Sequence, residues 1–591
     1  MKMKKTIILS FILALATSCD DLWEPAIENY REKEDSSEEA NYALGILMNG
    51  YLRIPSAGYS FNDVATDDAV SNDAYNGYRK LATGEWTSNN NTAGCWDNCY
   101  TAIQYMNIML EESDKVNWSS KEDLRRMFND RTKGEAYALR GMYMYYLLQA
   151  HAGRTADGKL MGVPIYTESQ TPESDHNRPR ATFDECIEQI YKDFNAASEL
   201  LPLDFENISS AAEMPEKYAG IDVGNYNRVF GDYNRQRITR RIMEGLMSRI
   251  TLLSASPLYN SSNDQSKWEA AADAAATVLD RINGIDGLAT NGNTWYNNHN
   301  EIEGLADGVN PREILWRTAI ASNSGLESDN YPPTLYGKGR VNPTQNLVDA
   351  FPMRNGYPIT DQRSEYDKEN PMNSRDPRLS LYIIANGDRM GPSNSTIYIL
   401  DKKNQTNDGV NQTETSTRTG YYMRKLLRTD VNLDPLYSNT QKHYTPHIRY
   451  TEIFLNYAEA ANEAWGPTGQ GSHNYSAYDV IKKIRTRAGV GTSNGDPYLE
   501  ECKGSKEQMR ELIRNERRLE LCFEGFRFWD LRRWKVSMSH LTENAKGTNI
   551  VDGEQIYQTV ENRIYKDYMY FGPIPYSETL KWDKLEQNIG W

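Results

Sequence analysis

Carboxylates and aromatic side chains carry the clearest chemical potential in this sequence. Asp67 and Asp68 are adjacent, and two neighbours on one segment do not by themselves flank a scissile glycosidic bond. The sequence contains no His-Glu-x-x-His zinc motif. The Gly337-Lys338-Gly339-Arg340 run lacks a third glycine and a preceding strand, and no complete EF-hand loop occurs. We therefore predict a protein that is not an enzyme and has no cofactor; a structural calcium ion is left open but not indicated.

Two stretches place aromatic rings beside Asn and Asp, outside any helical periodicity. A sugar ring offers its C–H face to an aromatic plate and its hydroxyl groups to amides and carboxylates. We predict ligand contacts in two clusters, which are Asp68, Asn72, Tyr75, Tyr78, Trp86 and Asn90, and then Trp295, Tyr296, Asn297 and Asn298, with His299 alongside. The alternative for each aromatic residue is packing between helices, above all for Trp86.

The amino-acid composition and net charge limit the classes of partner that this protein can bind. The 591-residue chain can bury a sizeable core and carries a net charge of −16, which argues against nucleic acid and against an anionic membrane surface. It holds 39 Tyr and 12 Trp but 13 Phe. Aromatic side chains with a polar group suit polar ligands, and they equally suit wet contacts between helices.

The N-terminus predicts export and a lipid anchor. Lys2, Lys4 and Lys5 precede an apolar stretch from Thr6 to Thr17 that is too short to remain as a membrane span. Leu15-Ala16-Thr17-Ser18-Cys19 resembles the bacterial lipoprotein cleavage box, in which Cys19 would become the acylated first residue. We predict a signal peptide over 1–18 and an acylated tether over 19–35. The five remaining cysteines show no disulfide-framework or zinc spacing.

The elements that must position the candidate ligand residues are predicted to be mainly helices. Small and large apolar residues recur at steps of three and four from about residue 36 to 283, as in Ala136, Leu139, Tyr143 and Tyr146. This pattern favours helix–turn–helix pairs of the tetratricopeptide type. Residues 284–444 are rich in Gly, Asn, Ser, Thr and Pro and predict an irregular, loop-rich segment, after which helices return over 445–591.

The stretch from Glu511 to Trp534 is predicted to be a core element. Its apolar residues fit a helix that runs up to Gly525, where the chain breaks into a second aromatic turn. Its arginines are nearly matched by glutamates and aspartates, so an internal ion-pair network that includes Arg517 and Glu520 is favoured over nucleic-acid binding.

Asn515 to Trp534, reading NERRLELCFEGFRFWDLRRW, closely resembles the C-terminal signature of the SusD/RagB family of Bacteroidetes. Further matching runs are RYTEIFLNYAEAANEA at 449–464, NPTQNLVDAFPMRNGYPITD and RDPRLSLYIIANGDR in the middle, and the tail from Tyr570 to Trp591. The resemblance covers essentially the whole mature chain. It implies one SusD-like domain over 36–591 with parts at 36–283, 284–444 and 445–591.

The resemblance also implies a function. Family members are surface lipoproteins that capture nutrients for a SusC-like TonB-dependent outer-membrane transporter, with ligand loops in the N-terminal part and the middle. Asp20 and Asp21 resemble the acidic tag that sends such lipoproteins to the cell surface. The expectation is a glycan-binding protein held at the outer membrane by lipid on Cys19. The alternatives are the same architecture with a peptide or other nutrient as ligand, and a lipid-anchored glycoside hydrolase.

Overall fold

Long helices form one layer of the molecule. The computed structural model describes residues 40–400, 406–551 and 554–591. The predicted signal peptide, Cys19 and the predicted tether lie outside these residues. The helices of eight or more residues are α2 (Ala40–Leu52), α4 (Trp96–Glu112), α5 (Glu122–His151), α6 (Phe183–Leu200), α7 (Val223–Phe230), α8 (Arg240–Ala255), α9 (Gln265–Asp280), α14 (Tyr450–Trp465), α15 (Ala477–Ala488) and α17 (Lys506–Glu520). In the described residues no helix is both long enough and apolar enough to cross a membrane.

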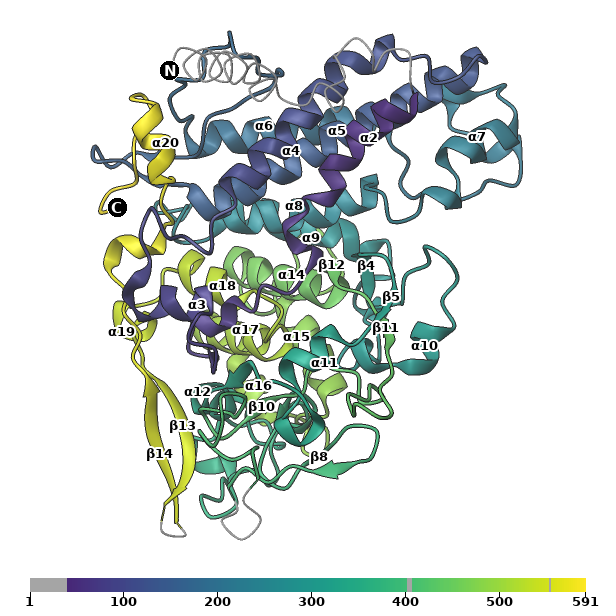
Figure 1. The fold of residues 1–591 in the computed structure, drawn as a ribbon. Coiled ribbons are helices and arrows are strands. Elements are labelled where there is room, and N and C mark those ends of the chain that lie inside the picture. The colour runs from purple at the N-terminus through teal and green to yellow at the C-terminus, as the bar shows by residue number, and fades with distance from the viewer. Residues whose placement is uncertain (1–39, 401–405, 552–553) are drawn as a thin grey trace, which may run out of the picture.

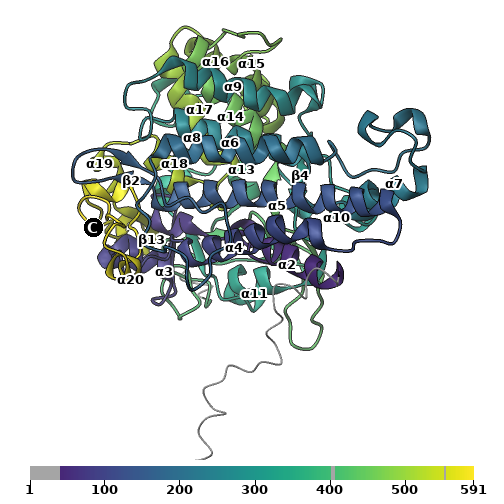
Figure 2. The same cartoon turned by 90° about the horizontal axis from the view of Figure 1, so that it is seen from above.

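These helices pack in consecutive pairs, and the mainly α prediction is confirmed. Helix α5 lies against α4 on one side and α6 on the other, α8 lies against α9, and α14 lies against α9 and α15 (Figure 2). The contact of α9 with α14 is close because both present buried alanines, such as Ala272 and Ala461. A capping box at Thr182 starts α6, because the Thr182 hydroxyl accepts from the Glu185 N–H at 3.2 Å.

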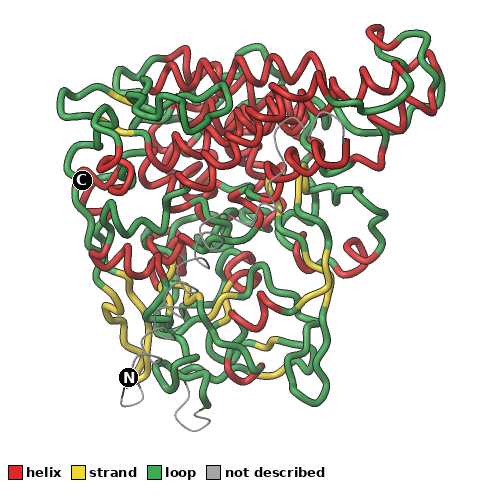
Figure 3. Tube along the Cα trace, turned by 45° about the horizontal axis from the view of Figure 1, so that its top comes forward, coloured by secondary structure: helices red, strands yellow, loops and turns green. Residues whose placement is uncertain are grey.

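Short elements and loops form the other half of the molecule (Figure 3). The short helices of the described residues are α3 (Gly77–Lys80), α10 (His299–Glu303), α11 (Gly325–Asn330), α12 (Gln345–Ala350), α13 (Pro377–Tyr382), α16 (Pro497–Cys502), α18 (Arg527–Arg533), α19 (Met538–Leu541) and α20 (Tyr576–Lys581). Helix α20 lies beside the long helices (Figure 1). The expected irregular middle segment is present, with α10 to α13 as its short helices.

The strands of the described residues form seven antiparallel pairs and no larger sheet. They are β1 (Ala69–Ser71) with β6 (Val341–Pro343), β2 (Gly153–Arg154) with β3 (Leu160–Met161), β4 (Ile314–Arg317) with β12 (Pro446–Arg449), β5 (Ala321–Asn323) with β11 (Gln441–His443), β7 (Ile383–Ile384) with β10 (Tyr422–Met423), β8 (Arg389–Met390) with β9 (Ser395–Thr396), and β13 (Ala545–Val551) with β14 (Glu554–Glu561). The β13–β14 hairpin extends along one side of the molecule (Figure 1).

Two hydrophobic clusters lie beneath these layers. The larger one is built mainly from the paired helices, and the second gathers apolar residues of the irregular middle segment. Leu519, Cys522 and Phe523 belong to the second cluster although they come from the C-terminal part of the chain. The Glu511–Trp534 stretch therefore joins the helical layer to the loops.

Helix α17 ends at Glu520, five residues before the predicted end at Gly525. Phe523 adopts a φ of 65° and Gly525 a φ of 82°, so the chain turns twice before α18 begins. The Lys425 ammonium donates to the carbonyls of Glu520 and Cys522, at 2.7 and 3.0 Å. Because these cationic donors satisfy carbonyls that another helical turn would occupy, the helix stops early.

The predicted ion-pair network is confirmed. Arg517 pairs with Asp530 at 2.8 Å, and Glu520 accepts from Arg378 and Arg487, each at 3.0 Å. All five side chains are buried or nearly so. Arginines of the irregular segment and of α15 thus reach the same face of α17, which ties the two halves of the molecule together.

Candidate functional site

The loop that follows β1 is held in place by two buried aspartates. Asp68 accepts from Arg518 at 2.6 Å, and Asp67 accepts from Arg527 at 2.9 and 2.8 Å. Burial opposes ionisation of Asp67, but the guanidinium groups of Arg518 and Arg527 hold its pKa well below the usual range. These contacts fix the base from which residues 72–80 extend to the surface.

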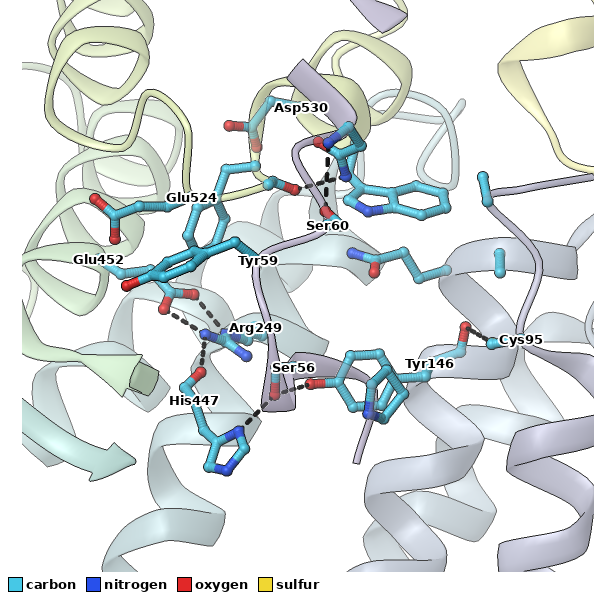
Figure 4. Close-up of a pocket in the computed structure, with 18 of the residues that line it drawn as sticks. Ser56, Tyr59, Ser60, Cys95, Tyr146, Arg249, His447, Glu452, Glu524 and Asp530 are labelled. Atoms are coloured by element: carbon cyan, nitrogen blue, oxygen red, sulfur yellow. Dashed lines mark hydrogen bonds and ion pairs between the residues drawn. The ribbon is translucent and has the colours of Figure 1, made fainter. Parts of the chain in front are cut away.

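A segment from Ser56 to Ser60 borders the first cavity, which has a volume of about 310 Å³ and which we call the inner cavity (Figure 4). The Ser56 hydroxyl lies 2.8 Å from His447 Nδ1 and 3.1 Å from the Tyr146 hydroxyl. Burial, and then the charge of Arg249, lower the pKa of His447 to about 3, so its ring is neutral near pH 7.

The charged side chains that line the inner cavity form ion pairs with one another. Arg249 donates to both carboxylate oxygens of Glu452, at 2.5 and 2.6 Å. Arg449 donates to Glu524 at 2.7 and 2.9 Å, and its positive charge helps to hold the pKa of Glu524 below the usual value despite burial. These groups stabilise one another and shape the cavity.

The second cavity, which we call the aromatic cavity, has a volume of about 420 Å³. Tyr59, Phe61, Trp295, Tyr296 and Tyr444 supply its rings, and Asn323, Asp329, Asn330 and His443 supply polar groups. Gly58, Tyr59 and Thr445 line both cavities, so the two hollows adjoin along the Ser56–Ser60 segment. A concave aromatic wall with a few polar groups is the usual form of a small-ligand site.

A third feature, the tyrosine platform, consists of Asn72, Tyr75, Tyr336 and Arg340. Pairing of β1 with β6, with Ser71 opposite Val341, brings the two loops together. The Asn72 amide donates to the Lys338 carbonyl at 2.9 Å, and the Arg340 guanidinium donates to Asn72 Oδ1 at 3.2 Å. Tyr75 is 84% exposed and Tyr336 is 58% exposed. Helices α3 and α11, which flank these loops, lie on one face of the molecule (Figures 1 and 2).

The platform turn is tight around Tyr336. Tyr336 has a φ of 63° and Gly339 a φ of 52°. A Cβ added at Gly337 would lie 2.2 Å from the Tyr331 carbonyl oxygen, so only glycine fits there. The Arg340 N–H donates to the carbonyl of Asp329, which lines the aromatic cavity, at 2.8 Å. The platform and the aromatic cavity are therefore neighbours.

The structure separates the residues of the first predicted cluster. Tyr75 and Asn90 are exposed, Asn72 is half-buried in the platform, and Tyr78 is half-buried at the inner cavity, where burial raises its pKa to about 12. Asp68 is buried in its ion pair with Arg518. Trp86 is 3% exposed and packs edge-on against Trp591 at 4.9 Å. Distant segments thus cover Asp68 and Trp86, and Trp86 takes the alternative of interior packing.

The second predicted cluster is also more buried than its composition indicates. Trp295 is 1% exposed and Tyr296 is buried, yet both line the aromatic cavity. Asn297 contacts Thr429, and Asn298 caps α10 by accepting from the Glu301 N–H at 3.4 Å. His299 lies 3.0 Å from Asp430. Whether any of these residues contacts a ligand stays a prediction.

Tyr59, Tyr336 and Arg340 are the site residues that sequence reasoning missed. Tyr336 stands directly before Gly337-Lys338-Gly339, and an aromatic residue beside closely spaced glycines is a signal for an exposed tight turn. Tyr59 carried no such signal, because its place between two cavities depends on β12 and on the α17–α18 connection. In the described parts of the chain, no group of three His, Cys, Asp or Glu side chains could hold a metal ion.

Known proteins of one family resemble this chain along most of its length. The model of the SusD family matches residues 292–591, and a family model described as starch-binding associating with outer membrane matches residues 40–221. SusD-like protein P38 of Formosa agariphila is 21% identical, over 76% of this chain and 78% of its own length. SusD-like protein P25 of the same organism is 24% identical, over 40% of this chain and 44% of its own length.

Solved structures share the fold across nearly the whole chain. A SusD-like protein of Bacteroides fragilis has a TM-score of 0.69 at 21% identity and covers 96% of this chain and 100% of its own. A SusD-like carbohydrate binding protein of the same organism has a TM-score of 0.66 at 22% identity, covering 93% and 99%. A laminarin binding SusD-like protein has a TM-score of 0.56 at 17% identity, covering 93% and 99%. With one family model matching more than half of its residues, this chain belongs to the SusD family.

Proposed function

We propose that this protein binds oligosaccharides or polysaccharides at the bacterial surface through the tyrosine platform and the adjoining aromatic cavity. The observation that carries the proposal is the pair of exposed rings, Tyr75 and Tyr336, on loops joined by Asn72. Aromatic faces left uncovered beside polar donors suit the C–H face and the hydroxyl rim of a sugar. The carbohydrate- and laminarin-binding descriptions of the structural relatives support the same ligand class.

We further propose that the bound glycan passes to a SusC-like TonB-dependent transporter, and that lipid on Cys19 holds the protein at the outer membrane. The family model that describes outer-membrane association supports this location. A binding protein that acts by delivery needs no catalytic pair. The charged side chains around the inner cavity are paired with one another, and this arrangement supports binding in preference to hydrolysis. A peptide or another nutrient remains the alternative ligand.

The test is binding to a panel of polysaccharides and their oligosaccharides by affinity electrophoresis and calorimetry. Tyr75→Ala and Tyr336→Ala should each weaken binding up to about tenfold, by analogy with the roughly 0.5–1.5 kcal/mol of an aromatic pair. The double variant should lose weak binding altogether. Tyr233→Ala is the matched control, since Tyr233 is 93% exposed and lies next to α7.

Four outcomes separate the hypotheses. Depletion of a glycan without new products supports a binding protein, whereas new reducing ends would indicate a hydrolase. Failure of every glycan in the panel to bind would contradict the proposed function. Undiminished glycan binding by the Tyr75→Ala/Tyr336→Ala double variant would move the binding site away from the platform.

A further inference from the structure

We propose that the tyrosine platform recognises the carboxylate of an acidic glycan, with Arg340 as the residue that binds the uronate group. The inference rests on the proposed function and adds the class of sugar to it. Its basis is the set of polar groups on the platform that the described residues leave unused.

Arg340 is the first of these groups. Its guanidinium is half-buried and donates one hydrogen bond, from Nη1 to Asn72 Oδ1 at 3.2 Å. Within residues 40–400, 406–551 and 554–591 it has no carboxylate partner. A guanidinium has five N–H donors in a planar fork that fits a carboxylate through two parallel hydrogen bonds. Most of the donors of Arg340 are therefore available to a ligand.

Lys80 is the second group. Its ammonium lies 5.5 Å from the centroid of the exposed Tyr75 ring, and it too has no carboxylate partner in the described part of the chain. The nearby Lys338 differs, because its ammonium pairs with Asp329 at 2.9 Å. Asp73 accepts the Tyr75 N–H at 2.9 Å, and this neutral donor leaves its carboxylate charged. Arg340 and Lys80 are thus two cations without a carboxylate partner in the described part of the chain, and a ligand carboxylate can supply one.

The amide that would serve a neutral sugar is already occupied. Asn72 Nδ2 donates to the Lys338 and Ser416 carbonyls at 2.9 and 3.2 Å, and its Oδ1 accepts from Arg340. The unused polar groups beside the exposed rings are consequently cationic donors. A hydroxyl group can accept from such a donor, but a carboxylate gains a charge-assisted and bidentate contact, which is roughly twice as strong as a neutral one.

The charge of the whole protein strengthens the argument. A net charge of −16 repels a polyanion from most of the surface. The platform differs from the rest of the surface, because Arg340 and Lys80 lie beside exposed tyrosines and have no carboxylate partner in the described residues. An acidic polysaccharide can therefore approach the platform and stack on its rings. We therefore expect a sugar ring on Tyr75 or Tyr336, with its carboxylate on the Arg340 guanidinium and Lys80 nearby.

The experiment compares acidic polysaccharides with their own uncharged derivatives. Polygalacturonate, alginate and glucuronoxylan are tested by affinity electrophoresis against their methyl-esterified or carboxyl-reduced forms, together with neutral glucans, galactans and mannans. We expect at least one acidic polymer to bind, and its uncharged derivative to bind at least tenfold more weakly. Binding to the acidic form should also weaken as salt is raised, because the pair is near the surface.

The Arg340→Gln substitution tests the positive charge of Arg340, because a glutamine amide is uncharged but can still donate a hydrogen bond to Asn72. The substitution should reduce the affinity for the acidic polysaccharide at least tenfold, to a value close to the affinity for the uncharged derivative. Arg228→Gln is the matched control, since Arg228 is an exposed arginine on α7, a helix that lies apart from α3 and α11 in both views (Figures 1 and 2). The melting temperature of each variant reports whether it is folded.

The outcomes distinguish this inference from the proposed function. If neutral glycans bind and the acidic ones do not, or if Arg340→Gln binds the acidic form like the wild type, the inference is wrong and the glycan-binding proposal stands. If no polysaccharide of either class binds, the proposed function itself fails.

Discussion

At the residue scale, burial decides which aromatic side chains can meet a ligand. Tyr75 and Tyr336 present free rings, whereas Trp86 and Trp295 are enclosed by other parts of the chain. Aromatic side chains thus have two roles in this protein. The tryptophans hold the loops in place, and the exposed tyrosines offer the surface on which a sugar could stack.

Trp295→Ala should lower the free energy of unfolding by about 3–5 kcal/mol, because it removes a large ring from a closed cluster. Tyr75→Ala should change it by less than about 0.5 kcal/mol, since the ring is exposed. Denaturant unfolding of the two variants is the measurement. Equal stabilities would contradict the assignment of Trp295 to the core.

Asp63→Asn should alter how stability depends on pH. Asp63 accepts the Phe523 N–H at 3.0 Å, and burial, followed by the charge of Asp68, raises its pKa from 3.8 to about 7. A carboxyl with a raised pKa is protonated in the folded state first, so its contribution to stability is full below about pH 4 and is lost as the pH rises through 7.

The wild type should therefore lose stability relative to Asp63→Asn between about pH 4 and pH 8. Melting temperatures of both proteins across this range are the measurement. The asparagine oxygen can still accept from Phe523, so the comparison isolates the charge. Parallel pH profiles would show that Asp63 is ionised throughout.

At the element scale, α17 and the turn after it connect the two halves of the protein. The carboxylates of α17 receive arginines from the irregular segment and from α15, and its final carbonyls receive Lys425. The same connection places Asp67 and Asp68 through Arg527 and Arg518. The most charged helix of the chain is consequently an internal support for the ligand loops.

Arg517→Ala should destabilise the fold by about 1.5–3 kcal/mol, because it removes a charge-assisted hydrogen bond from the buried carboxylate of Asp530, which keeps its pair with Arg533. Glycan affinity of the folded fraction should stay unchanged, since Arg517 is buried and its guanidinium is bonded to Asp530 and Asn456. Lys159→Ala is the control, because its pair with Asp157 is at the surface. An unchanged melting temperature for Arg517→Ala would place this face in solvent.

At the scale of the whole molecule, a helical layer is joined to an irregular half that carries the aromatic cavity and the platform, and residues of both line the inner cavity. Such a division suits a protein that binds a polymer and transfers it to a partner. The anchor belongs to this scale as well, because a lipid at the N-terminus would keep the binding face near the transporter that we propose.

Cys19→Ala should release the protein from the outer membrane or leave it unprocessed, because several acyl chains together anchor stably whereas one binds marginally. Membrane fractionation and N-terminal mass spectrometry are the measurements. A Cys19→Ala protein that fractionates with membranes and has a normally processed N-terminus would contradict the lipoprotein assignment.

The sequence by itself determined the helices, the irregular middle segment and the family. Apolar periodicity is a local property, so the repeats of α5 and the chain break at Gly525 could be read directly. The ion-pair character of the Glu511–Trp534 stretch followed from its balance of charge. The end of α17 was misplaced, because the Lys425 side chain that occupies its carbonyls is remote in sequence.

The tertiary structure alone decided which candidate residues face solvent. Asp68 is buried by Arg518, which lies 450 positions away, and Trp86 is covered by Trp591 at the chain end. Tyr336 and Arg340 join Asn72 and Tyr75 because β1 pairs with β6 across more than 260 positions. Burial depends on which distant segments come into contact, and the local composition of a segment does not specify those contacts.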